Sequence, residues 1–142
     1  MGIRLKIEGV ETIQLDEHNI LTSRFMFDTS SDTAARATDV LTALEVTGKI
    51  LTAVDGTPVD DTQKIARWSL VRAESADCYR VVTVEVISAG QVVRKYQLPN
   101  AFVSDYDESF GEDGDGSGKF RLIARQKSDL FDKTKVEGGY DL

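Results

Sequence analysis

The chain has 142 residues, of which 41% are hydrophobic and 29% charged, a balance typical of one globular domain with its own core. Its formal net charge of −7 argues against a protein that grips nucleic acid through its phosphates, because such binding needs clustered Lys and Arg. One cysteine, Cys78, excludes an internal disulfide. The first residues contain no apolar signal-peptide core, and no apolar run is long enough to cross a bilayer. We therefore expect a soluble protein that is made in the cytoplasm without a signal peptide.

The N-terminal residues alternate as a half-buried strand does. Apolar side chains at Ile3, Leu5 and Ile7 are separated by charged ones, which predicts a strand that closes at Gly9. Residues 10–15 either continue this strand or pair back on it. A polar turn at 16–19 then leads into a further strand over 20–27.

Residues 28–53 carry two competing patterns. Ser30, Ser31 and Asp32 are typical of a helix cap, and apolar residues follow at helical spacing. From Val40 onward an alternating pattern favours a strand instead. The second pattern is the stronger, so the prediction is a polar loop over 28–38 and a strand over 39–53.

One short helix is predicted over residues 61–71, after a turn at 55–58. Asp60 and Gln63 have the spacing of a capping box, in which the first caps the helix and the second reaches back. The expected buried face carries large apolar side chains, namely Ile65 and Trp68, with Leu70 as a further candidate. Such a helix would cover one end or face of a sheet.

The segment from Tyr79 to Val103 is expected to form a β-hairpin. Its first run is rich in β-branched residues, which suit a pleated surface. Ser88, Ala89 and Gly90 form a short connection whose glycine can take a positive φ. A hairpin alone is barely stable in water, so other segments must supply further strands.

The C-terminal third contains an acidic glycine-rich loop at 111–118 and a last strand over 119–126. Residues 128–142 are interpreted as an exposed or partner-dependent tail. The totals predict a mainly β single domain over residues 1–127, built as a β-barrel or a two-sheet sandwich of about seven or eight strands with one short helix.

The acidic loop raises the possibility of a metal site. Asp113, Asp115 and Ser117 match the opening of a calcium loop, with Gly118 following. The twelfth position, which should be a bidentate Glu, is Ala124. These three residues are the weak metal candidates, and an acidic, flexible hairpin loop is the alternative.

No constellation typical of catalysis appears in the sequence. His18 is the only histidine and lies in a polar turn, so we expect its side chain to lie on the surface. Cys78 is expected to be a small, semi-buried side chain. Lys119 follows Gly118 but is followed by Phe120, whereas a phosphate-binding loop needs Ser or Thr there. The sequence thus predicts no enzyme and no cofactor.

Residues 80–126 resemble a known family. A β-rich strand and short turn are followed by Tyr96-Gln97-Leu98, then by Asn100-Ala101-Phe102-Val103-Ser104-Asp105-Tyr106, an acidic Gly loop and Gly118-Lys119-Phe120-Arg121-Leu122-Ile123-Ala124. This order looks like the C-terminal half of tube proteins from contractile injection machines, a group that includes the Hcp proteins of type VI secretion and the tail-tube proteins of contractile phages and tailocins.

The resemblance implies a structural subunit that assembles into rings, usually hexameric, which stack into a tube. Sheath and baseplate or spike proteins are the implied partners, with no specific nucleic-acid binding and no membrane. Assembly in the cytoplasm would precede release as a virion or extracellular particle. The long loops at 28–38 and 111–118 are candidates for inter-ring contacts, and an acidic lumen that repels DNA or acidic cargo is a hypothesis. The alternative is a small β-barrel module that binds calcium or a small ligand at 113–118.

Overall fold

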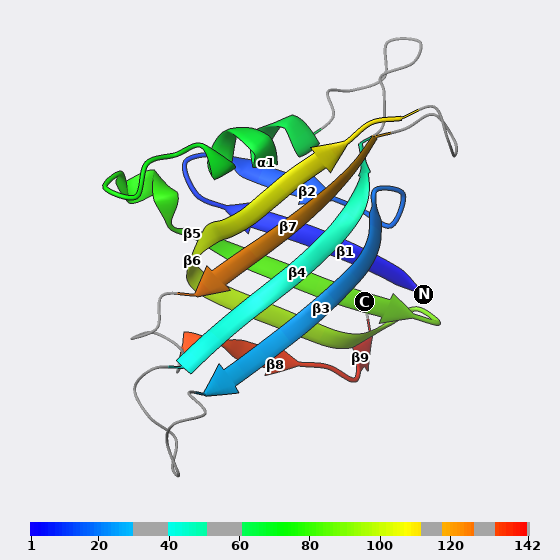
Figure 1. Ribbon diagram of the computed structural model, residues 1–142. Helices are drawn as coiled ribbons and strands as arrows, with labels where there is room; N and C mark the ends of the chain where they lie inside the picture. Colours follow the sequence, from blue (N-terminus) through cyan, green and yellow to red (C-terminus); the bar gives the residue numbers. More distant parts are fainter. Residues whose placement is uncertain (30–39, 51–60, 112–117, 127–132, 142) are drawn as a thin grey trace.

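The computed structural model describes residues 1–29, 40–50, 61–111, 118–126 and 133–141. The described residues form one antiparallel sheet of nine strands, one α-helix and one 3-10 turn, η1 (Ala76–Cys78) (Figure 1). The prediction of a mainly β chain with one short helix is confirmed. In chain order the strands and the helix are β1 Gly2–Glu8, β2 Thr12–Leu15, β3 Ile20–Thr29, β4 Val40–Ile50, α1 Thr62–Ser69, β5 Arg80–Ser88, β6 Gln91–Ser109, β7 Gly118–Gln126, β8 Lys135–Glu137 and β9 Tyr140–Asp141.

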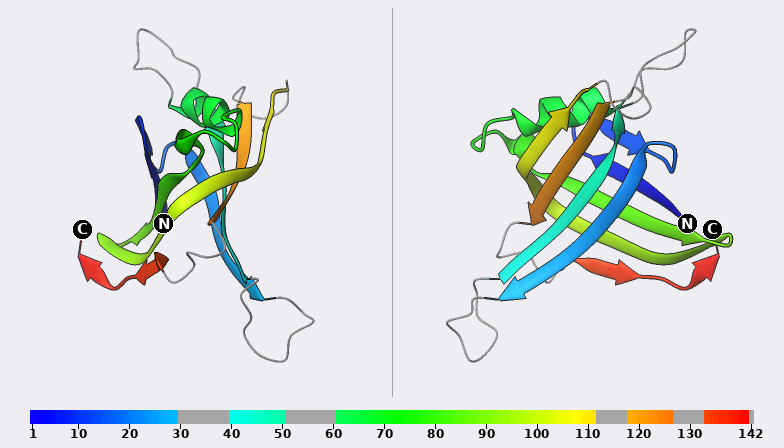
Figure 2. Two further views of the ribbon diagram at one scale, coloured as in Figure 1. Left: turned by 90° about the vertical axis from the view of Figure 1, so that its left-hand side faces the viewer. Right: turned by 45° about the vertical axis from the view of Figure 1, so that its right-hand side comes forward.

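The sheet folds over on itself instead of closing into a barrel. Its strand order is β2-β1-β5-β6-β7-β4-β3, and β8 and β9 also pair with β6. The 19-residue strand β6 belongs to both halves: it pairs with β5 up to Leu98 and once more at Ala101, and from Ala101 onward it pairs with β7. Between them, Asn100 has a φ of 55°, a left-handed conformation that Asn tolerates better than most residues. Figure 2 shows the resulting bend, at which the chain of β6 swings from one layer to the other.

The two halves of the sheet face each other, and we name them for their strands. The β1 layer consists of β2, β1, β5 and residues 91–98 of β6, with β8 and β9 at its margin. The β3 layer consists of β3, β4, β7 and residues 101–109 of β6. In each layer the inner face points toward the other layer and the outer face points away from it.

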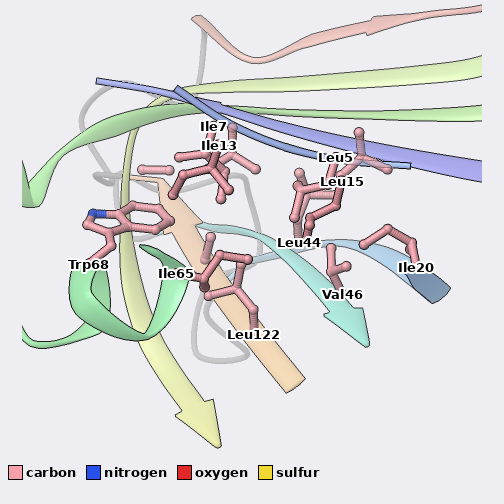
Figure 3. Close-up of a cluster of buried hydrophobic side chains, with 14 of the residues drawn as sticks. Leu5, Ile7, Ile13, Leu15, Ile20, Leu44, Val46, Ile65, Trp68 and Leu122 are labelled. Carbon is pink, nitrogen blue, oxygen red and sulfur yellow. The ribbon is translucent and has the colours of Figure 1, made fainter. Parts of the chain in front are cut away.

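The core fills the space between the inner faces. Leu5 and Ile7 of the β1 layer lie opposite Leu44 and Leu122 of the β3 layer, and all four are at most 1% exposed (Figure 3). The alternation of Ile3, Leu5 and Ile7 therefore marks the inner face of β1, as expected from a period of two. Away from the helix, stacked rings of Phe25 and Tyr96, with centroids 4.6 Å apart, join the two layers.

Helix α1 covers one end of the core (Figures 1 and 3). Ile65 and Trp68 are buried as predicted, and the indole Nε1 of Trp68 donates a hydrogen bond to the carbonyl oxygen of Cys78 at 3.0 Å. Leu70 was a wrong candidate, since it follows the last helical turn and is 82% exposed.

The capping of α1 differs from the expected capping box. Its N-cap is Asp61, whose side chain makes no cap hydrogen bond and instead accepts one from the backbone N–H of Gln14 on β2. Gln63 accepts from Arg67 one turn later instead of reaching back. The helix start is thus fixed by a contact with β2, which a local sequence motif cannot reveal. Asp60 lies outside the described residues.

The other strand predictions hold with shifted ends. Residues 12–15 pair back on β1, so the second of the two alternatives is correct. Strand β3 continues through Thr29, and the predicted loop therefore cannot begin at 28. Strand β4 begins at Val40. The remainder of the loop and residues 51–53 of the predicted strand lie outside the described residues.

Two stretches form strands where none was predicted from periodicity. Residues 104–109 continue β6, and within the C-terminal segment β8 and β9 pair with residues 95–97 and 91–92 of β6. The side chains of β8 and β9 are all exposed, as expected for this segment. The division of the chain into a domain over 1–127 and a tail over 128–142 stays a prediction.

Candidate assembly surface

The β3 layer has an open edge on each side. Among the described strands, none pairs with β3 on the side away from β4, or with residues 102–109 of β6 on the side away from β7. Each edge is long and presents backbone N–H and C=O groups that can pair with another strand. Adjacent strands of the layer alternate in direction, so β3 and this part of β6 run opposite to each other.

Opposite charges meet on the outer face of the β3 layer. Arg24 of β3 lies directly opposite Glu45 of β4. The guanidinium of Arg121 on β7 donates to the Glu45 carboxylate at 3.1 Å, and another of its nitrogens lies 3.7 Å from the Asp107 carboxylate on β6. Charge thus alternates from one edge of the layer to the other, and we name these four residues the charge ladder. Such cross-strand pairs each stabilise a sheet by about 0.2–1 kcal/mol.

The described side chains of the outer face carry both signs of charge. Among the side chains that the structure describes, the register places five basic ones on this face, Arg24, Lys49, Lys119, Arg121 and Arg125, and three acidic ones, Glu45, Asp105 and Asp107. The net charge of −7 for the whole chain therefore does not come from this face.

The two edges carry complementary side chains on this same face. Among the outward positions with described side chains are Thr22, Arg24 and Met26 on β3, and Phe102, Asp105, Asp107 and Ser109 on β6. Arg24, Asp105 and Asp107 are exposed, whereas Met26 and Phe102 are half-buried. One edge thus offers a cation and a thioether, and the other offers carboxylates and an aromatic ring.

The metal candidates Asp113, Asp115 and Ser117 lie outside the described residues, so the calcium hypothesis stays a prediction. Elsewhere in the described ranges, no three His, Cys, Asp or Glu side chains gather as a metal site would require. His18 is exposed in its turn, as expected. Cys78 is half-buried, and burial, followed by the nearby charge of Asp77, raises the pKa of its thiol, which disfavours the reactive thiolate.

A cleft of about 450 Å³ opens on the outer side of the β1 layer. Arg4 and Lys6 of β1, Gln14 of β2 and Glu85 of β5 contribute to its lining. These residues offer both signs of charge, and the lining contains no histidine, cysteine or serine that could act as a nucleophile or base. We assign no chemistry to this cleft.

Sequence reasoning missed a buried arginine beneath the helix. Arg80 is 4% exposed, and its Nε and Nη2 donate to the Asp77 carboxylate at 3.1 and 2.7 Å. Its guanidinium also lies 5.3 Å from the centre of the Trp68 ring, and its Nη1 is 3.8 Å from Glu11. The spacing of Asp77 and Arg80 was a local signal, but it did not indicate that the helix and the β1–β2 turn converge on the same side chain.

No family model matches the sequence, and no curated protein matches it at a significant level. The fold is nevertheless similar to that of several solved structures. Hcp1 from Flavobacterium johnsoniae superposes with a TM-score of 0.60 at 12% identity, covering 100% of both chains. Hcp1 from Salmonella typhimurium gives 0.53 at 13% identity, over 87% of this chain and 81% of that one. A chain of the sheath–tube complex of an extracellular contractile injection system, PVC, in the extended state gives 0.53 at 8% identity, over 96% and 88%.

At these identities the likeness concerns the fold. The chain has the fold of Hcp-like tube proteins, as its resemblance to them implied. In the described part of the chain, no helix is both long and apolar enough to span a membrane.

Proposed function

We propose that this chain is a structural, non-enzymatic subunit that assembles head to tail into a ring, hexameric by analogy with the tube proteins it resembles, and that the rings stack into the inner tube of a contractile injection apparatus. The observation that carries this proposal is the pair of open edges on the β3 layer. The likeness to Hcp1 proteins and to a chain of a sheath–tube complex supports it.

The strand directions suit ring closure. Copies related by rotation about one axis keep the same strand directions relative to that axis. Because the β3 layer contributes an even number of strands in alternating directions, the β3 of one copy would run antiparallel to the β6 of the next. Closure would then remove every open edge of the layer, which otherwise invites uncontrolled association.

The outer face of the β3 layer is the surface that would line the channel. Its inner face already packs against the β1 layer, which leaves the outer face for the side toward the ring axis. The lining would therefore be balanced in charge instead of acidic, contrary to the hypothesis of a repelling acidic lumen. A cargo would meet both signs of charge, including the Arg121 guanidinium paired with Glu45 and Asp107.

The β1 layer would face outward in such a ring, toward a sheath. One similar chain comes from a sheath–tube complex and another from a baseplate structure, which supports sheath and baseplate proteins as partners. The loops within 28–38 and 111–118 are the proposed inter-ring contacts. Assembly in the cytoplasm and release as a phage tail, tailocin or secreted particle complete the proposal.

Mass in solution tests the assembly directly. Light scattering over a range of concentrations should give a mass about six times the 15.7 kDa of one chain, and negative-stain images should show rings or stacked rings. A strict monomer at high concentration, with no rings on the grid, would contradict the proposal.

Amide hydrogen exchange would locate the joint in the same samples. On ring formation, alternate amides of β3 over 22–29 and of β6 over 102–109, those that point away from β4 and β7, should become protected, since they gain hydrogen-bond partners. Strands β4 and β7 are already paired on both sides and are the internal control. Protection that appears in β2 or β9 instead would place the joint elsewhere.

A further inference from the structure

The charge ladder ends differently at the two edges of the β3 layer. It begins with the basic Arg24 on β3 and ends with the acidic Asp107 on β6, with Glu45 and Arg121 between them. Asp105 is a second exposed carboxylate on the same face of β6. A neighbouring copy placed beside the layer would therefore bring a cation next to one of two carboxylates.

The registers show how the two ends would meet. The row that contains Arg24 runs through Glu45 and Ile123 to Asp105, and the next row ends at Asp107. A closed sheet needs a stagger between its strands, and only shifts by an even number of residues keep side chains on the same face. An unshifted joint would pair Arg24 with Asp105, and a shift by two residues in one direction would pair it with Asp107.

A second pair of side chains supports the same orientation. Met26 of β3 and Phe102 of β6 lie at the two ends of the row on the other side of the Arg24 row, and both are half-buried. A methionine sulfur beside an aromatic ring is a favourable contact. The unshifted joint of β3 to β6 would therefore place Arg24 beside Asp105 in one row and Met26 beside Phe102 in the adjacent row.

We propose that Arg24 pairs with Asp105 or Asp107 of the neighbouring copy, and that this pairing selects the head-to-tail joint on which the proposed function rests. The alternative joints are two-fold symmetric, with β3 against β3 or β6 against β6. A joint of β6 against β6 would bring the Asp105 and Asp107 carboxylates of both copies together, and a joint of β3 against β3 centred on Arg24 would set two guanidiniums side by side, which disfavours both. The ladder thus directs the chain toward a ring and away from a closed two-chain dimer.

Charge reversal at the basic end tests the pairing. Arg24→Asp should raise the concentration needed for half-maximal ring formation by about tenfold or more, because it places like charges at every joint. Arg94→Glu is the matched control: Arg94 is also exposed, but it lies in the β1-layer half of β6, away from both edges. Thermal melting should show that both variants fold.

Restoring complementarity within one chain gives the decisive measurement. Arg24→Asp combined with Asp105→Arg, or Arg24→Asp combined with Asp107→Arg, recreates opposite charges at each joint. One of the two should form rings again at concentrations close to those of the natural chain, and the variant that does so reports the register. If both double variants fold but stay unassembled, the pairing is refuted.

The outcomes separate this inference from the proposed function. If the natural chain forms rings and Arg24→Asp forms them equally well, the charge pairing is overturned while the tube function stands. If the natural chain forms no rings, the proposed function fails and the pairing fails with it. Ring formation that weakens as salt is raised in the natural chain, but less so in Arg24→Asp, would support an electrostatic joint.

Discussion

At the scale of single residues, Arg80 holds together three segments that are distant in sequence. Its guanidinium is paired with Asp77, lies over the ring of Trp68 and approaches Glu11 of the β1–β2 turn. Gly9 in that turn leaves room for it, since a Cβ at Gly9 would come within 2.8 Å of the Arg80 side chain. One buried cation thereby fixes the position of the helix over the core.

Replacing this arginine should cost much of the stability of the fold. Arg80→Ala removes a buried, hydrogen-bonded cation together with its packing against Trp68, and we expect a loss of about 2–4 kcal/mol in the free energy of unfolding. Urea denaturation followed by tryptophan fluorescence measures it. Arg72→Ala makes the same change at an exposed site and should stay within about 0.5 kcal/mol of the natural chain. Equal losses in the two variants would show that Arg80 has no special role.

At the scale of elements, the strands that could be predicted are those whose inward-facing apolar residues recur at every second position. Ile3, Leu5 and Ile7 alternate without interruption, and β1 was correctly predicted. The second half of β6 was not predicted from periodicity. A bulge at Ser104 places the inward-facing Val103 and Tyr106 three residues apart, which breaks the period of two. Strands β8 and β9 were not predicted for another reason. They pair through their backbones and bury none of their own side chains, so their sequences show no alternation of apolar and polar residues.

The candidate surface was less accessible to sequence reasoning than the fold. The charge ladder forms only because four strands pair in a particular order, which brings Arg24, Glu45, Arg121 and Asp107 into line. Local periodicity predicts strands but not the order in which they pair. The resemblance to tube proteins predicted an assembly through sheet edges, but not which edges or side chains would form it. The composition of the acidic loop suggested a calcium site, but its candidate ligands lie outside the described residues.

The β5–β6 hairpin offers a test in which two neighbouring substitutions should act in opposite directions. Ala89 and Gly90 have φ angles of 53° and 75°, so both turn residues are left-handed, as in a type I′ turn. Ala89→Asn should stabilise the protein by about 0.5–1 kcal/mol, because Asn tolerates this conformation better. Gly90→Ala should destabilise it by a similar amount through backbone strain alone, since a Cβ there meets no atom within 4 Å. Thermal melting of both variants checks the signs, and a shift in the same direction for both would contradict this account of the turn.

At the scale of the whole molecule, the sheet has margins of two kinds. The edges of the β3 layer are long and open, whereas the margin of the β1 layer at residues 91–97 of β6 is covered by β8 and β9. Gly138 allows this cover to lie close, because a Cβ there would be 2.3 Å from the carbonyl oxygen of Val93. The backbone N–H of Gly139 donates to Val92 at 2.8 Å. The same strand, β6, is thus protected in one half and open for assembly in the other.

Removing the cover should alter association more than folding. A chain that ends at residue 132 loses β8 and β9, whose side chains are exposed, and frees the backbone edge of β6 with which they pair. We expect a loss of about 1–2 kcal/mol, which the remaining core can tolerate. The uncovered edge of β6 should then pair with other copies, so light scattering should detect irregular aggregates beside any rings. Gly138→Val, which keeps the segment but pushes it off the edge, should aggregate in the same way. If the shortened chain is as monodisperse as the complete one, β8 and β9 do not act as a cover.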